Sequence, residues 1–189
     1  MSKSAGSSGG GSASAAARAL TPLAQMEQNL GHCKTPELAC AELSKIFNVK
    51  PGEVALLRVE KEVMNFLFPV ELKTAGSIPL SSASAVAART ANTRKLELFN
   101  SFVIVQHANV FETIKLSTLG QSEEPGANTI QKLMSTPVID SQQNVIGVIQ
   151  VCRKGITPDN AGADFTLADL HKLELAAKAL SRMPFMYAA

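Results

Sequence analysis

The chain has 189 residues, a formal net charge of +2 and 18% charged residues. This length corresponds to one domain of ordinary size with a real hydrophobic core. Lysine and arginine are scattered rather than clustered, and the aromatic residues are eight Phe, one Tyr and no Trp. Basic clusters and stacking aromatics are typical of nucleic-acid binding. We therefore expect no nucleic-acid partner.

The sequence also indicates the compartment. No apolar stretch reaches the roughly 20 residues that a transmembrane helix needs, and the N-terminus has no continuous apolar segment of the signal-peptide type. The three cysteines, Cys33, Cys40 and Cys152, are an odd number without C-x-x-C spacing. We interpret them as buried free thiols, and we predict a cytoplasmic protein with no membrane contact.

Residues 1–19 are mostly Ser, Gly and Ala. Such a composition cannot bury enough apolar surface to offset its ordering entropy, so it predicts a flexible tail, which could also be a linker. Residues 20–34 then have the apolar spacing of a short amphipathic helix. Thr21-Pro22 is a plausible start and Gly31 a plausible end.

A single domain is predicted over residues 35–183. Thr35 and Pro36 favour the start of its first helix, which we expect to end after Phe47. Two strands, 54–60 and 64–72, should follow. Pro69 lies inside the second of these, which favours an edge strand or a bulge.

The middle of the domain is less regular. An extended piece at residues 78–80 precedes Ser81-Ser82, which we expect to cap a helix over residues 83–91. Because that helix consists mostly of Ala, Val and Ser, it is thin enough to form a pocket wall. A short strand is expected at residues 96–100. The connection 93–129, with a helix from Asn109 to Gly120, is interpreted as a lid or variable insertion.

The strongest strand signal is a hairpin. Two β-branched runs, Thr136 to Ile139 and Val145 to Cys152, flank the polar turn 140–144. Gly147 inside the second run indicates a bulge or a close approach of another backbone or a ligand. A closing helix capped by Thr166 and Asp169 follows, and residues 184–189 are predicted to be a C-terminal tail.

The order of these elements resembles the GAF domain, a PAS-like sensor fold. The segment S-T-P-V-I-D-S-Q-Q-N-V-I-G-V-I-Q-V from Ser135 carries most of the resemblance. Phe165 with Asp169-Leu170, and G-S-I-P-L from Gly76, are also similar to the family pattern. The resemblance implies an α+β fold whose central antiparallel sheet has the first and last helices on one face. It places a ligand pocket on the other face.

The resemblance implies regulation or signal transduction more than chemistry. Bilin-binding members commonly attach the chromophore to a Cys followed by His beside the pocket. Here the order is His32-Cys33, before the first domain helix, so no covalent bilin is expected. The Asn-Lys-Phe-Asp-Glu signature of the cyclic-nucleotide class cannot be traced. A free methionine-(R)-sulfoxide reductase keeps its cysteines in the pocket section, but residues 77–136 contain none. We therefore predict no enzyme activity and no metal.

What remains is a sensor that binds a small molecule, dimerises, or both. Homodimer formation is expected through the terminal helices, and a signalling protein partner would carry the output. The alternative readings are a ligandless docking or dimerisation module, and a small GAF-fold enzyme. By position, the candidate ligand-binding residues are Phe66, Phe68, Val86, Arg89, Asn100, His107 and Thr136.

Overall fold

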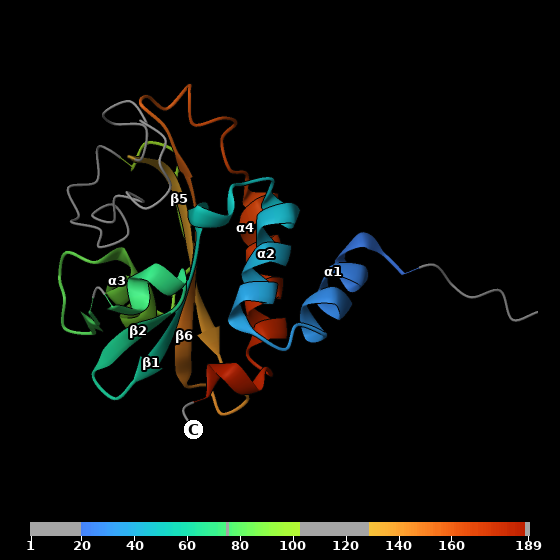
Figure 1. The fold of residues 1–189 in the computed structure, drawn as a ribbon, viewed down its shortest axis with the longest axis vertical. Helices are drawn as coiled ribbons and strands as arrows, with labels where there is room; N and C mark the ends of the chain where they lie inside the picture. Colours follow the sequence, from blue (N-terminus) through green and yellow to red (C-terminus); the bar gives the residue numbers. More distant parts are fainter. Residues whose placement is uncertain (1–19, 75, 103–128, 188–189) are drawn as a thin grey trace, which may run out of the picture.

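A computed structural model describes residues 20–74, 76–102 and 129–187. Its centre is a sheet of six strands in the order β3-β2-β1-β6-β5-β4, in which every neighbouring pair is antiparallel. Helices α2 (Pro36–Phe47) and α4 (Leu167–Leu180) cover one face, and α3 (Val86–Thr93) lies on the other (Figure 1). The structure confirms the α+β fold class and the placement of the first and last domain helices.

The predicted hairpin forms the middle of this sheet. Strands β5 (Ile130–Ile139) and β6 (Val145–Lys154) pair along their whole length, with β5 almost entirely buried and β6 buried in its middle. The turn between them is held by Asp140, whose Oδ1 accepts the N–H groups of Gln142 and Asn144, each at 2.8 Å. β5 begins earlier than predicted, because its first half contains polar residues such as Gln131 and Lys132, which are not typical of a β-branched run.

Gly147 lies where β6 meets β1 (Val54–Glu60), opposite Arg58. A Cβ atom at this position would stand 2.4 Å from the Leu57 carbonyl oxygen and 2.5 Å from the Met186 side chain. The close backbone approach expected from the sequence is therefore confirmed, and the neighbour is the protein itself.

Strand β2 (Val63–Phe68) is shorter than predicted, because the chain turns at Pro69 into a short 3₁₀ helix, Val70–Thr74. The pairing of β2 with β1 shifts near that end, so that Leu56 opposes Phe68 while Leu57 opposes Phe66. The irregularity expected near Pro69 is confirmed. Beyond β2, the sheet ends in the two-residue strand β3 (Ile78–Pro79).

Local capping signals located most helix starts correctly. Thr21 caps α1 (Pro22–Gly31), Thr35 caps α2, and Thr166 forms a capping box with Asp169 at the start of α4. Helix α3 is the exception. It begins at Val86, three residues later than predicted, because its N-cap is Ala85 and the Ser82 hydroxyl contacts Ser84 instead. The short strand β4 (Glu97–Phe99) follows, and the helix predicted from Asn109 to Gly120 lies outside the described residues.

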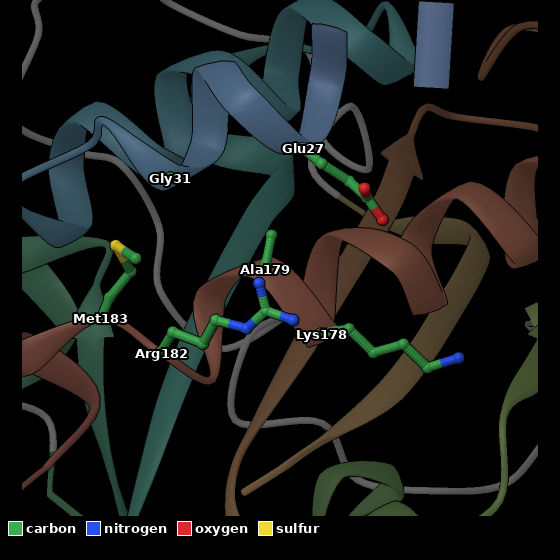
Figure 2. Close-up of a pocket in the computed structure, with 6 residues that line it drawn as sticks. All are labelled: Glu27, Gly31, Lys178, Ala179, Arg182 and Met183. Carbon is green, nitrogen blue, oxygen red and sulfur yellow. The ribbon is translucent and has the colours of Figure 1, made fainter. Parts of the chain in front are cut away.

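Helix α1 packs against α4 outside the two layers (Figure 1). It buries Met26 and Leu30, while the small residues Ala176 and Ala179 of α4 are also buried. Figure 2 shows the shallow groove of about 90 Å³ between the two helices, with Glu27 on one side and Lys178 and Arg182 on the other. The small-residue face of α4 is thus covered by a helix of the same chain.

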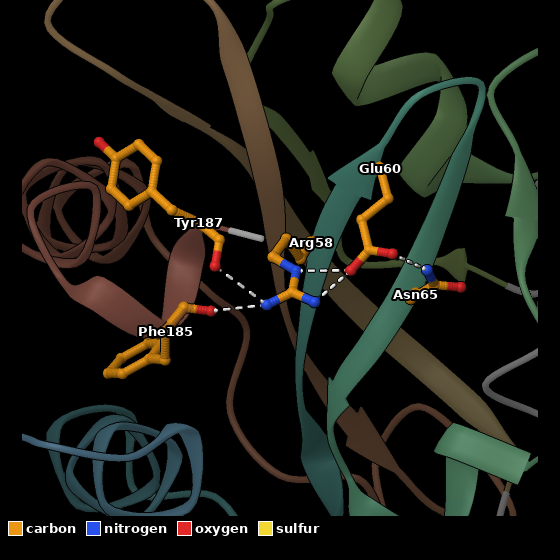
Figure 3. A network of polar contacts seen from close by, with 5 residues as sticks. All are labelled: Arg58, Glu60, Asn65, Phe185 and Tyr187. Carbon is orange, nitrogen blue, oxygen red and sulfur yellow. Dashed lines mark hydrogen bonds and ion pairs between the residues drawn. The ribbon is translucent and has the colours of Figure 1, made fainter. Parts of the chain in front are cut away.

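The last residues return to the sheet. The short helix η4 (Pro184–Met186) buries Met186, so this part of the segment predicted to be a tail is packed. Figure 3 shows Arg58 of β1 donating to the carbonyl oxygens of Phe185 at 3.3 Å and Tyr187 at 3.2 Å. The same guanidinium pairs with Glu60, which also accepts from Asn65 at 2.8 Å. Arg58 therefore joins the sheet to the end of the described chain.

Replacing Gly147 should destabilise the fold. The Gly147→Ala variant is expected to lose about 1–3 kcal/mol of unfolding free energy, because its Cβ would displace the β1 backbone. Gly31→Ala is the control, since a Cβ there has nothing within 4 Å and should change stability by less than about 1 kcal/mol. Urea unfolding measures both. Equal effects of the two variants would contradict the close approach.

Acid should weaken the contact between Arg58 and Glu60. The hydrogen bond from Arg58 lowers the pKa of Glu60 below its ordinary value of 4.5. A carboxyl whose pKa is lower in the folded state adds stability above its unfolded pKa and loses it as the pH falls through the folded value. Glu60→Gln should therefore be less stable than wild type at about pH 7, and the difference should shrink toward about pH 3.

The control for losing one negative charge is Glu62→Gln, in the exposed turn beside Glu60. Urea unfolding at a series of pH values measures all three proteins. A difference between wild type and Glu60→Gln that stays constant across this range would show that the pair with Arg58 contributes no acid-sensitive stability.

Candidate functional site

The face of the sheet under α3 differs from the opposite face. On the α2 and α4 side, the helices press long apolar side chains onto the strands. Helix α3 has only eight residues, and its buried residues include Ala87, Ala88 and Ala91. Small side chains let a helix approach the sheet closely, so α3 forms a thin wall over this face, and its role as the wall of a pocket stays a prediction.

A buried polar network lies beneath this wall. The Thr90 hydroxyl donates to Glu97 Oε2 at 2.6 Å and lies 2.8 Å from the Ser135 hydroxyl. Because the single Thr90 proton is used on Glu97, Ser135 must donate to Thr90. The Gln150 amide in turn lies 3.4 Å from Ser135 as a donor. The donors therefore run in one direction, from Gln150 through Ser135 and Thr90 to the Glu97 carboxylate.

The carboxylate at the end of this network is paired. Arg89 Nε donates to Glu97 Oε1 at 2.7 Å, and the guanidinium lies 5.5 Å from the centre of the Phe99 ring. Thr90, Ser135 and Gln150 are at most 2% exposed, whereas the side chains of Arg89 and Glu97 are 33% and 15% exposed. The network therefore leads from the centre of the sheet to a charged pair near its surface.

Three of the predicted site residues lie on this face. Phe66 and Val86 belong to its apolar cluster, and Arg89 belongs to the charged pair. The apolar cluster and the polar network together form a buried layer that is mostly apolar with a few fixed polar groups. Small-molecule sites usually have this composition.

Two predicted site residues lie on the opposite face. Phe68 packs against the cluster under α2 and α4, because the shift in pairing with β1 reverses the facing of β2 at its end. Thr136 opposes Ile149, which belongs to that same cluster. The Thr136 hydroxyl is buried and has no hydrogen-bond partner among the described residues. Neither side chain can therefore contact the α3 network.

Asn100 is not in the network. Asn100 exchanges two hydrogen bonds of 2.9 Å with the backbone of Phe165, which ties the end of β4 to the start of α4. This bonding gives Asn100 a structural role. His107 lies outside the described residues.

The polar members of the network were not among the predicted site residues: Thr90, Glu97, Ser135 and Gln150. A signal was present in the two long strands. Ser135 and Gln150 interrupt otherwise aliphatic runs, and an uncharged polar residue inside a fully buried strand needs a hydrogen-bond partner. The hairpin register then pairs these two residues directly.

The sheet separates Cys152 from the other two cysteines. Cys33 and Cys40 lie in the cluster under α2 and α4, where burial raises the pKa of each thiol. Cys152 lies in the cluster on the α3 face. Within the described ranges, no group of three His, Cys, Asp or Glu side chains is placed to hold a metal ion.

The fold matches solved structures. No profile of a known protein family and no curated protein matches the sequence. The GAF domain of an Acinetobacter phosphoenolpyruvate-protein phosphotransferase aligns with 84% of this chain over 87% of its own length, at 13% identity and a TM-score of 0.59. The GAF domain of a phosphoenolpyruvate-protein phosphotransferase from Coxiella burnetii aligns with 84% of this chain over 88% of its own length, at 9% identity and a TM-score of 0.58. The chain therefore has the GAF fold.

The prediction that this chain is not an enzyme is wrong as an inference. The structure of fRMsr of Staphylococcus aureus in complex with substrate covers 87% of this chain and 96% of its own, at 11% identity and a TM-score of 0.52. Such proteins are free methionine-R-sulfoxide reductases. The GAF fold therefore includes enzymes, and a count of cysteines between Ser77 and Thr136 does not decide the question, since Cys152 also reaches the α3 face.

Among the helices that the structure describes, none combines the length and the apolar character needed to cross a bilayer.

Proposed function

We propose that this chain is a regulatory GAF domain that binds a small polar molecule on the α3 face of its sheet. The observation that carries the proposal is the buried network of Thr90, Glu97, Ser135 and Gln150. Polar groups at the centre of a sheet cost desolvation energy, which an apolar core of the same shape avoids. These groups form one connected set of hydrogen bonds that ends at the charged pair, and this connection favours a role in recognition.

The arrangement supports a ligand with both apolar and polar parts. Phe66, Val86 and their neighbours offer apolar contact, while the network ends in the pair formed by Arg89 and Glu97. Fixed donors and acceptors in a low-dielectric site discriminate strongly between ligands, because a mismatched ligand leaves buried groups unpaired. Binding would in this way select a hydrogen-bonding molecule over its apolar analogues.

The homodimer and the signalling partner stay predictions. Helix α1 covers the small-residue face of α4, while Leu23 of α1 and Leu20 just before it are exposed. Leu167 at the start of α4 is also exposed, and a second copy of the chain could cover such side chains.

A native mass spectrum of the freshly purified full chain tests the proposal. We expect a discrete mass excess that is released on denaturation, and the same spectrum gives the number of subunits. The released molecule, added back to stripped protein, should bind about tenfold more weakly to Ser135→Ala, because the variant lacks one buried hydrogen-bonding group.

The matched control is Ser44→Ala, which removes a buried hydroxyl on the α2 side, where Ser44 donates to the Cys40 carbonyl at 2.8 Å. It should bind like wild type. Absence of any adduct, with no change when metabolites are added, would contradict the proposal. Equal losses in the two variants would place the ligand elsewhere.

A further inference from the structure

A second hollow, of about 340 Å³, lies away from the α3 network. It forms where the C-terminal end of α2 meets the short helix η1 (Pro51–Glu53), the end of β6 and the loop that follows β6. Figure 1 shows this loop running from the sheet to the start of α4, beside the end of α2. Its charged lining residues are three cations, Lys50, Arg153 and Lys154, and one carboxylate, Glu53.

The carboxylate is already satisfied by the backbone. Glu53 Oε2 accepts the N–H of Lys50, and Oε1 accepts the N–H of Lys154, each at 2.7 Å. The Glu53 residue is only 6% exposed. Glu53 therefore fixes the backbones of the two lysines next to each other, while its own charge is turned toward these N–H groups.

Arg153 is held in one orientation. Its guanidinium donates to the carbonyl oxygens of Phe47 at 3.2 Å and Asn48 at 3.1 Å, and it lies 4.7 Å from the centre of the Phe165 ring. Its Nε is buried, and within the part of the chain that the structure describes it has no hydrogen-bond partner. The positive charge also offsets the negative end of the α2 dipole, which would otherwise repel an anion. A preformed cation loses little conformational entropy when a ligand binds.

The size of the hollow indicates the class of ligand. Its volume lies at the lower end of the range for small-molecule sites. Val49, Ala161 and Gly162 complete the wall with apolar and backbone groups. A site with an excess of positive charge and this volume fits a compact molecule that carries a phosphate.

We propose that the hollow between α2 and β6 binds a compact phosphorylated small molecule, with Lys50, Arg153 and Lys154 providing the charge for its phosphate. Phosphate oxygens accept strong charge-assisted hydrogen bonds from both lysine and arginine. The site is distinct from the proposed ligand site under α3, and either can exist without the other.

Pyrophosphate is the probe. Titrated into the ¹⁵N-labelled full chain, it should shift the amide signals of Lys154 and of Asn160 to Gly162, while the signals of α3 stay in place. Calorimetry on the same samples gives the dissociation constant. Absence of shifts, or shifts spread over lysines across the surface, would overturn the proposal.

A charge-matched pair of variants tests the residues. The double variant Lys50→Ala with Lys154→Ala should bind pyrophosphate about tenfold or more weakly, since two charge-assisted contacts are lost. The control, Lys34→Ala with Lys95→Ala, removes the same charge from two exposed lysines elsewhere and should change affinity less than about twofold. Equal losses of pyrophosphate affinity in the two double variants would mean that the protein attracts the anion non-specifically, and this would overturn the proposal. If the first double variant does not fold, the exposed Lys50→Ala alone should still weaken binding severalfold.

Discussion

The pairing of β5 with β6 is the contact on which the rest of the structure depends. Both strands are buried on both faces, and successive residues face opposite layers. Leu133 and Ser135 therefore face α3, while Met134 and Val138 face α2 and α4. A register change of one residue would exchange the two sets and place the Ser135 hydroxyl in the apolar layer.

This alternation gives the two faces of the sheet different properties. The α2 and α4 side is stabilised mainly by burial of apolar surface, and the Arg58 contacts join the last residues to the same sheet. The α3 side carries a polar network that lowers the gain from burial but offers fixed hydrogen-bonding groups. Apolar burial stabilises both faces, and our proposal places recognition on the α3 face, where the polar network lies.

Local sequence signals predicted most elements, because caps and hairpin turns depend on neighbouring residues. Thr35, Thr166 and the turn at Asp140 are examples. The side of the sheet on which the Phe68 side chain lies could not be predicted from the sequence, because it depends on a shift in pairing with another strand. The network was missed for a related reason. Thr90 and Ser135 are 45 residues apart, and only the packing of α3 on β5 brings them together.

Hydrogen exchange tests the central claim, that the two faces have separate roles, most directly. The protein as purified is compared with the same protein after denaturation, removal of small molecules and refolding. We predict slower exchange in the purified sample for peptides covering α3 and the middle of β5, with no difference in α2 and α4. A difference confined to α2 and α4, or identical exchange in both samples, would contradict the account.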